Sequence, residues 1–206
     1  GLKIYTAFDP QAHRGLVEGR RDTLSSLVAQ ELDPKKEVQL GALIVDIPTG
    51  EIQALLASRD DRHGFHRVLD ARRQIGSLVK PFVVAAALEE NLNFHGGTLV
   101  RDQAITLQDA KDRVWSPQNY DHSESGIVRL ETVISKSINQ ATVHLAVGLG
   151  LDKILDRLIG YGIRVDLSRP PSTILGVSEM SPFSIAERYQ GLLNQGYLVP
   201  LKAVRS

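Results

Sequence analysis

A serine and a lysine stand three residues apart in the segment Ser77-Leu78-Val79-Lys80. On a helix, positions i and i+3 share one face, so these two side chains can touch. A serine hydroxyl is a weak nucleophile that needs a base beside it, and burial favours the neutral amine of a lysine. The spacing therefore predicts a serine nucleophile, Ser77, with Lys80 as its base. The alternative is that Ser77 caps a helix and Lys80 lies on the surface.

A second serine lies in the segment Ser137-Ile138-Asn139, between two stretches with helical patterns. At a loop tip Ser137 can pass a proton, and the amide of Asn139 can both donate to and accept from a substrate amide. The alternative is a plain helix break, because serine and asparagine both favour helix caps.

The elements that must hold these residues follow from local pattern. Residues 77–91 are apolar nearly all round and predict a buried central helix with Pro81 in its first turn. Two apolar runs flank the turn Pro48-Thr49-Gly50-Glu51 and predict a hairpin of largely buried strands. We also expect a strand over 2–8 and a further set of helices, at about 10–32, 129–136, 140–149, 151–160 and 182–195.

Composition excludes several classes of function. The chain has 206 residues, 42% of them hydrophobic, which suits one sizeable domain. Its formal net charge is zero, so we expect no nucleic-acid partner. It has no cysteine, and His63 and His66 lack the carboxylate of a zinc-binding helix, so we predict no metal and no cofactor. No apolar run reaches the roughly 20 residues that span a bilayer, which indicates a soluble protein or an internal piece of an anchored one.

Together these segments resemble the class A penicillin-binding proteins, and in particular their 1b branch. S-x-x-K followed by Ser-x-Asn is the order of motifs in that family. The resemblance covers essentially the whole chain, in the same order as in the family. Besides Ser137-Ile138-Asn139, it rests on the segments Lys3–Pro10, Ala42–Leu56, Ala71–Pro81, Trp115–Asn119 and Pro171–Gly176.

The resemblance implies an α/β (α+β) fold of the serine β-lactamase and penicillin-binding transpeptidase type, with an antiparallel sheet flanked by helices. It implies that Ser77 attacks the penultimate D-alanine of a peptidoglycan stem peptide, with Lys80 as base, and that an amine of a second stem resolves the acyl-enzyme. Ser137 would relay the proton and Asn139 would hold the substrate amide. Trp115 and Asn119 would line the substrate cleft, although residue type alone favours for Trp115 an aromatic packed under a loop.

The resemblance also implies partners and a location. The partners are stem peptides ending in D-Ala-D-Ala and β-lactam antibiotics, which would acylate Ser77 as substrate mimics. The parent protein would carry a glycosyltransferase domain upstream and a membrane anchor outside this chain, and would act on the periplasmic face of the bacterial inner membrane. We expect an opening strand and linker helix over 1–38 and the transpeptidase domain over 39–206.

The sequence departs from the family pattern at one motif. Lys-Thr-Gly, which in the family binds the substrate carboxylate and helps form the oxyanion hole, occurs nowhere in the chain. We therefore expect a fragment, incomplete at its C-terminus, with low activity of its own. Two other interpretations stay open: a D,D-carboxypeptidase or β-lactamase of the same fold, and a non-catalytic binding fragment.

Overall fold

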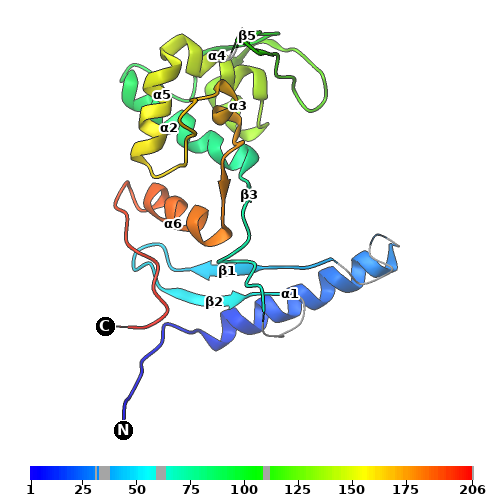
Figure 1. Cartoon of the computed structure of the whole chain (residues 1–206), viewed down its shortest axis with the longest axis vertical. Helices are drawn as coiled ribbons and strands as arrows, with labels where there is room; N and C mark the ends of the chain where they lie inside the picture. The colour runs from blue at the N-terminus through cyan, green and yellow to red at the C-terminus, as the bar shows by residue number, and fades with distance from the viewer. Residues whose placement is uncertain (31, 33–37, 59–63, 109–111, 206) are drawn as a thin grey trace. The chain divides into compact units, whose positions relative to one another are not determined.

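The computed structural model describes residues 1–206 except 31, 33–37, 59–63, 109–111 and 206 (Figure 1). The described chain forms two compact units, and each is treated by itself below. Unit 1 contains residues 1–72 and 180–206, and unit 2 contains residues 73–179. The predicted boundary between 38 and 39 falls within unit 1 and stays a prediction.

Unit 1 begins with the helix α1, Pro10–Ala29. The carboxylate of Asp9 caps it by accepting hydrogen bonds from the backbone N–H groups of Gln11 at 2.7 Å and Ala12 at 3.2 Å. Pro10 occupies the first turn, where no intrahelical donor is needed. The predicted start is confirmed. The helix ends at Ala29 rather than near residue 32, and Leu24 is its one buried residue, so little packing supports the last turn.

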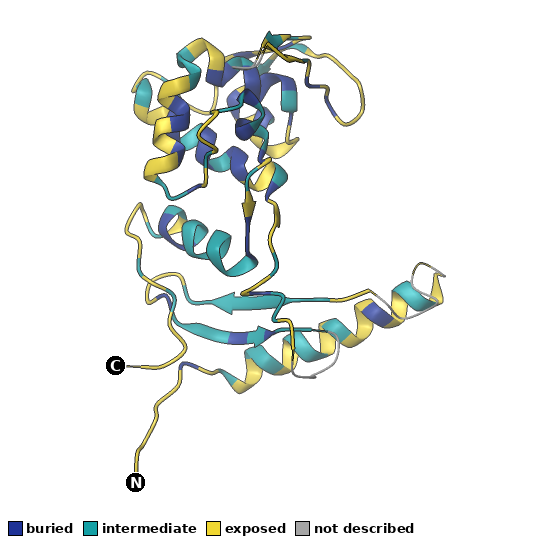
Figure 2. Ribbon diagram, viewed as in Figure 1, coloured by how far each residue is buried: buried dark blue, intermediate teal, exposed yellow. Residues whose placement is uncertain are grey.

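The predicted hairpin is confirmed as β1, Ala42–Val45, paired antiparallel with β2, Ile52–Leu56. Its turn is closed by the carboxylate of Asp46, which accepts from the backbone N–H of Thr49 at 3.0 Å and from its hydroxyl at 2.6 Å. The prediction that both strands are largely buried is wrong. Only Ala54 and Leu56 are buried, and the other strand residues are half-buried (Figure 2).

The predicted strand over 2–8 is also wrong, because the described chain offers it a partner at one point only. Thr6 forms an isolated bridge with Val204, and Ala7 N–H donates to the carbonyl of Ala203 at 2.9 Å. The last helix of unit 1 is α6, Pro182–Leu193, close to its predicted range and capped by the hydroxyl of Ser181.

Unit 2 holds both serine motifs. The predicted helix over 77–91 is confirmed, but its first turn is a 3-10 turn, η1, Gly76–Val79, followed by α2, Lys80–Glu90. Pro81 explains the difference, because it lacks the N–H that would donate to the carbonyl of Ser77 in an α-helix. The N–H of Lys80 donates to that carbonyl instead.

The other elements of unit 2 are short strands and helices. Besides its helices, the unit contains the antiparallel strand pairs β4–β7 and β5–β6. Residues 73–74 (β3) and 179–180 (β8) lie where the chain passes from one unit to the other. The elements within the unit are β4 Leu99–Asp102, β5 Leu107–Gln108, β6 Val114–Trp115, β7 Gly126–Arg129, α3 Leu130–Ser135, α4 Asn139–Leu149, α5 Leu151–Gly160 and η2 Pro171–Leu175.

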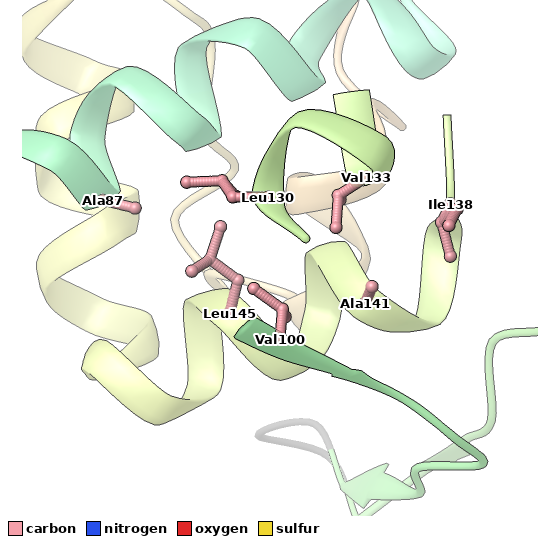
Figure 3. Packing of buried hydrophobic residues seen from close by; sticks show 7 residues of the cluster. All are labelled: Ala87, Val100, Leu130, Val133, Ile138, Ala141 and Leu145. Atoms are coloured by element: carbon pink, nitrogen blue, oxygen red, sulfur yellow. The ribbon is translucent and has the colours of Figure 1, made fainter. Parts of the chain in front are cut away.

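One part of the core of unit 2 lies between α2, α3, α4 and β4. Figure 3 shows seven buried side chains gathered there, and each fully buried valine or leucine contributes about 1.5–3 kcal/mol. This cluster fixes α2 against α4, and so fixes the two serine motifs relative to each other. Its residues are Ala87, Val100, Leu130, Val133, Ile138, Ala141 and Leu145. No helix in the described parts of the chain has both the length and the apolar character needed to cross a membrane.

Candidate active site

The two ends of the Ser77-x-x-Lys80 motif have opposite environments. Ser77 lies on η1 with an exposed side chain. Lys80 is the first residue of α2, and only 2% of it is exposed. An exposed hydroxyl thus stands one turn from a buried amine, and the role of Ser77 as nucleophile stays a prediction.

The Ser137-x-Asn139 motif lies at the turn between α3 and α4, and it meets the first motif. The Nζ of Lys80 donates to the hydroxyl of Ser137 at 3.0 Å, to Oδ1 of Asn139 at 2.6 Å and to the backbone carbonyl of Ser137. The hydroxyl of Ser137 donates to that of Ser77 at 2.9 Å. Side chains of two motifs that lie about 60 residues apart in sequence therefore form one hydrogen-bonded chain.

Ser137 stands between the other two groups. The helical spacing predicts that Ser77 and Lys80 touch, but among the described residues no hydrogen bond joins their side chains directly. Ser137 reaches this position with a left-handed backbone, at a φ of 55°. A non-glycine residue in that region costs about 1–2 kcal/mol. The surrounding contacts must supply that energy.

Burial sets the protonation of the amine. Because desolvation penalises the ammonium form, the pKa of Lys80 falls from 10.5 to about 8. At pH 7.4 about a fifth of Lys80 is then neutral, roughly two hundred times the fraction of an ordinary lysine. Lys80 can therefore accept a proton near neutral pH, which an ordinary surface lysine does poorly.

The backbone before Ser77 is held by the segment after η2. Gly76 N–H donates to the carbonyl of Gly176 at 2.8 Å, and Ile75 N–H donates to that of Ser178 at 3.0 Å. Gly176 has a φ of +83°, and a Cβ there would stand 2.0 Å from the carbonyl oxygen of Gly76. Only glycine allows this approach. Sequence reasoning missed this role, although the resemblance rests in part on the Pro171–Gly176 segment.

Asn139 is oriented by a loop carbonyl. Its Nδ2 donates to the backbone oxygen of Gln118 at 2.9 Å while its Oδ1 accepts from Lys80. The neighbouring Asn119 is 7% exposed, and its amide is hydrogen-bonded within the protein to Asp102, Ser123 and Gln140. The expected direct contact of Asn119 with substrate stays a prediction, and its place in this buried network is the observed fact.

Trp115 is half-buried on β6, where it pairs with Leu107 of β5. No hydrogen bond of the described residues joins its side chain to the three catalytic candidates. A cavity of about 220 Å³ lies beside Ser137, and Asp102, Asn119 and Ser123 contribute to its wall. In the described parts of the chain, no three His, Asp or Glu side chains gather as metal ligands would.

A buried amine joined through one serine to a second, exposed serine can support acyl transfer to the exposed serine, the chemistry of serine acyltransferases as a class. Comparison with known families agrees with this class. Residues 40–206 match the family described as the penicillin binding protein transpeptidase domain. The chain belongs to this family.

Proteins of the 1B type are similar to this chain along its whole length. The chain is 36% identical over 208 residues to penicillin-binding protein 1B of Vibrio cholerae, and 32% identical over 210 residues to that of Escherichia coli. All of this chain is aligned in both cases. It spans only about a quarter of those relatives, 26% and 25% of their lengths.

Solved structures show the same fold. The crystal structure of penicillin-binding protein 1A from Haemophilus influenzae aligns with 81% of this chain, at a TM-score of 0.73 and 24% sequence identity. The aligned part is 25% of the Haemophilus influenzae chain. The penicillin-binding protein PonA1 from Mycobacterium tuberculosis aligns with all of this chain and 53% of its own, at a TM-score of 0.74 and 22% identity. The predicted penicillin-binding transpeptidase fold is thus confirmed.

Proposed function

We propose that this chain carries the acylating centre of a peptidoglycan D,D-transpeptidase, with Ser77 as nucleophile. The observation that carries the proposal is the hydrogen-bonded chain from Ser77 through Ser137 to Lys80. It gives an exposed hydroxyl a path for its proton to a buried amine of lowered pKa. The family match and the likeness to 1B-type proteins support the same substrate class.

In the acylation step, Ser77 Oγ bonds to the carbonyl carbon of the penultimate D-alanine. Its proton passes through the hydroxyl of Ser137 to neutral Lys80. The peptide C–N bond then breaks, and the terminal D-alanine leaves as an amine that takes a proton back from Lys80 through Ser137. In the second step an amine of another stem attacks the ester and Ser77 regains its proton. A cross-link results, with no net change in the enzyme.

Asn139 keeps capacity for substrate in this scheme. Each of its amide atoms has one protein partner, Lys80 for the oxygen and the Gln118 carbonyl for the nitrogen. One N–H and one lone pair remain. These suit the amide of a peptide backbone, so Asn139 would orient the base and bind the substrate at once.

The remaining assignments come from the family. We propose that the parent protein is membrane-anchored, acts in the periplasm, carries a glycosyltransferase domain and is acylated by β-lactams. The chain contains no Lys-Thr-Gly, so groups outside it would bind the substrate carboxylate. Losing one oxyanion donor costs about 10²–10³ in rate, and we therefore propose that the 206-residue chain alone acylates slowly.

The lifetime of the acyl-enzyme tests the proposal. The chain and the full-length protein encoded by its gene are mixed with a penicillin, and the intact mass is followed over hours. A transpeptidase keeps a one-to-one adduct and passes an acyl group from a stem-peptide analogue to an added amine. Rapid release of penicillin as hydrolysed product would instead favour a β-lactamase. Acyl transfer to water alone, from the peptide analogue, would favour a D,D-carboxypeptidase.

A further inference from the structure

A buried carboxylate lies behind the Ser137-x-Asn139 turn, outside the three groups described above. Asp102 ends β4 and is 1% exposed. Its Oδ1 accepts from Nδ2 of Asn119 at 2.7 Å, and its Oδ2 accepts from the backbone N–H of Ser125 at 2.9 Å. No cation among the described residues pairs with it. Burying a carboxylate without a counter-charge costs free energy, so its two hydrogen bonds must offset that cost.

The carboxylate helps to decide which way the amide of Asn119 points, together with the carbonyl of Ser123, which accepts from Nδ2 at 2.8 Å. Ionised aspartate can only accept hydrogen bonds, so it requires the Nδ2 of Asn119 on its side. The Oδ1 of Asn119 then faces the backbone N–H of Gln140 and accepts from it at 3.0 Å. That N–H can only donate, so both ends of the Asn119 amide are specified. An amide at position 102 would remove the carboxylate's part in this rule, because an amide can donate as well, and it would leave Nδ2 with neutral acceptors only, the Ser123 carbonyl and Oε1 of Gln140.

This arrangement caps the helix that carries Asn139. The first N–H groups of a helix have no partner within it, and the residue before α4, Ile138, offers no side-chain cap. Asn119 supplies the missing acceptor from another part of the chain. Its neighbour Gln118 offers the carbonyl that accepts from Nδ2 of Asn139 at 2.9 Å. One short loop therefore fixes both the start of α4 and the side chain of Asn139.

We propose that Asp102 is a positioning residue for Asn139, acting through the Asn119 amide and the Gln118 carbonyl. The proposal rests on the function proposed above, because it assigns Asp102 a place behind the group that orients the Lys80 base. No hydrogen bond among the described residues joins Asp102 to Ser77 or Lys80. Its effect on the site passes through the position of Asn139 alone.

The direct test is the titration of Lys80, followed by NMR on its ¹³Cε in the 206-residue chain. Oδ1 of Asn139 accepts from Nζ of Lys80, so losing that acceptor destabilises the ammonium form and lowers the pKa. We expect Asn139→Ala to lower the pKa of Lys80 by about one unit, and Asp102→Asn by about half as much. Val143→Ala, which removes packing from the buried side of α4 without touching the network, controls for general loosening and leaves the titration unchanged.

A double variant separates positioning from direct charge effects. Removing the Asp102 charge could itself lower the pKa of Lys80 through the electric field, and that effect would persist without Asn139. Positioning predicts that Asp102→Asn has no further effect in the Asn139→Ala background. A folded Asp102→Asn protein with a wild-type titration, or a shift that survives in the double variant, overturns the proposal.

Two further measurements keep the test decisive. If Asp102→Asn does not fold, Gln140→Met removes the other side-chain acceptor of Asn119 without changing charge. It should shift the pKa of Lys80 downward by a smaller amount, and no shift would overturn the proposal. Acylation by penicillin is measured on the same samples. A wild-type chain and full-length protein that never acylate would refute the proposed function, whereas the titrations alone decide the role of Asp102.

Discussion

Replacing Gly176 by alanine should move the backbone that presents Ser77. The new Cβ would stand 2.0 Å from the carbonyl oxygen of Gly76, where real Cβ contacts stay above 3.0 Å, so the two segments must separate by at least 1.0 Å. The φ of +83° adds about 1–2 kcal/mol of strain. A misplacement of about 1 Å at a reacting group can cost about 100-fold in rate. We therefore expect Gly176→Ala to acylate about 100 times more slowly.

The assay is the second-order rate of acylation by a fluorescent penicillin, measured on the full-length protein, with the unfolding midpoint recorded beside it. Gly196→Ala is the matched control, because Gly196 has a φ of +89° and a Cβ added there would meet no atom within 4 Å. It should lose similar stability and keep its acylation rate. Equal acylation rates for a folded Gly176→Ala and the wild type would show that the contact between Gly76 and Gly176 does not position the nucleophile.

Three further predictions concern the base and the relay. The rate of acylation should rise about tenfold for each pH unit below 8 and level off above it, because the neutral form of Lys80 is the proposed base. Lys80→Arg should acylate about 10³-fold more slowly, because arginine is not deprotonated. A rate of acylation that does not depend on pH would contradict this role of Lys80. The folded pKa of Lys80 lies below its unfolded value, so the unfolded state binds more protons between these values and stability rises with pH there. Urea titrations should show that the free energy of unfolding rises by about 2 kcal/mol between pH 8 and 10, and that Lys80→Met lacks this rise. An equal dependence of unfolding free energy on pH in the two proteins would refute the pKa assigned to Lys80. Ser137→Ala should acylate about 100-fold more slowly by stopped-flow fluorescence, because Ser77 loses its link to Lys80; an unchanged rate would remove Ser137 from the proton path.

The helices were the most predictable part of the fold, because their signals are local. Asp9 and Pro10 mark the start of α1 within the sequence itself, and α5 covers the predicted range of 151–160. The strand expected over 2–8 failed because a strand depends on a partner far along the chain. The prediction that β1 and β2 are largely buried failed for a related reason. Apolar residues indicate that a strand can be buried, but they do not tell which element covers it.

The candidate site likewise has features that the sequence predicts and features that only the structure shows. The two serine motifs, and the roles proposed for their residues, followed from residue type, spacing and resemblance. The bridging position of Ser137 did not, because the hydrogen bond from Ser137 to Ser77 joins residues 60 apart in sequence. The contact of Gly176 with Gly76 and the network around Asp102 are equally long-range. Asn119 illustrates the limit: the resemblance includes its segment, but its buried place behind Asn139 needed the three-dimensional structure.

The central claim is that Ser77 is the nucleophile of an acylating centre. Its most direct test is the intact mass of the full-length protein after incubation with a penicillin, followed by peptide mapping, with Ser77→Ala as control. The account predicts one persistent adduct per molecule, located on Ser77 and absent from the variant. An adduct on another residue, or none on a folded full-length protein, would contradict it.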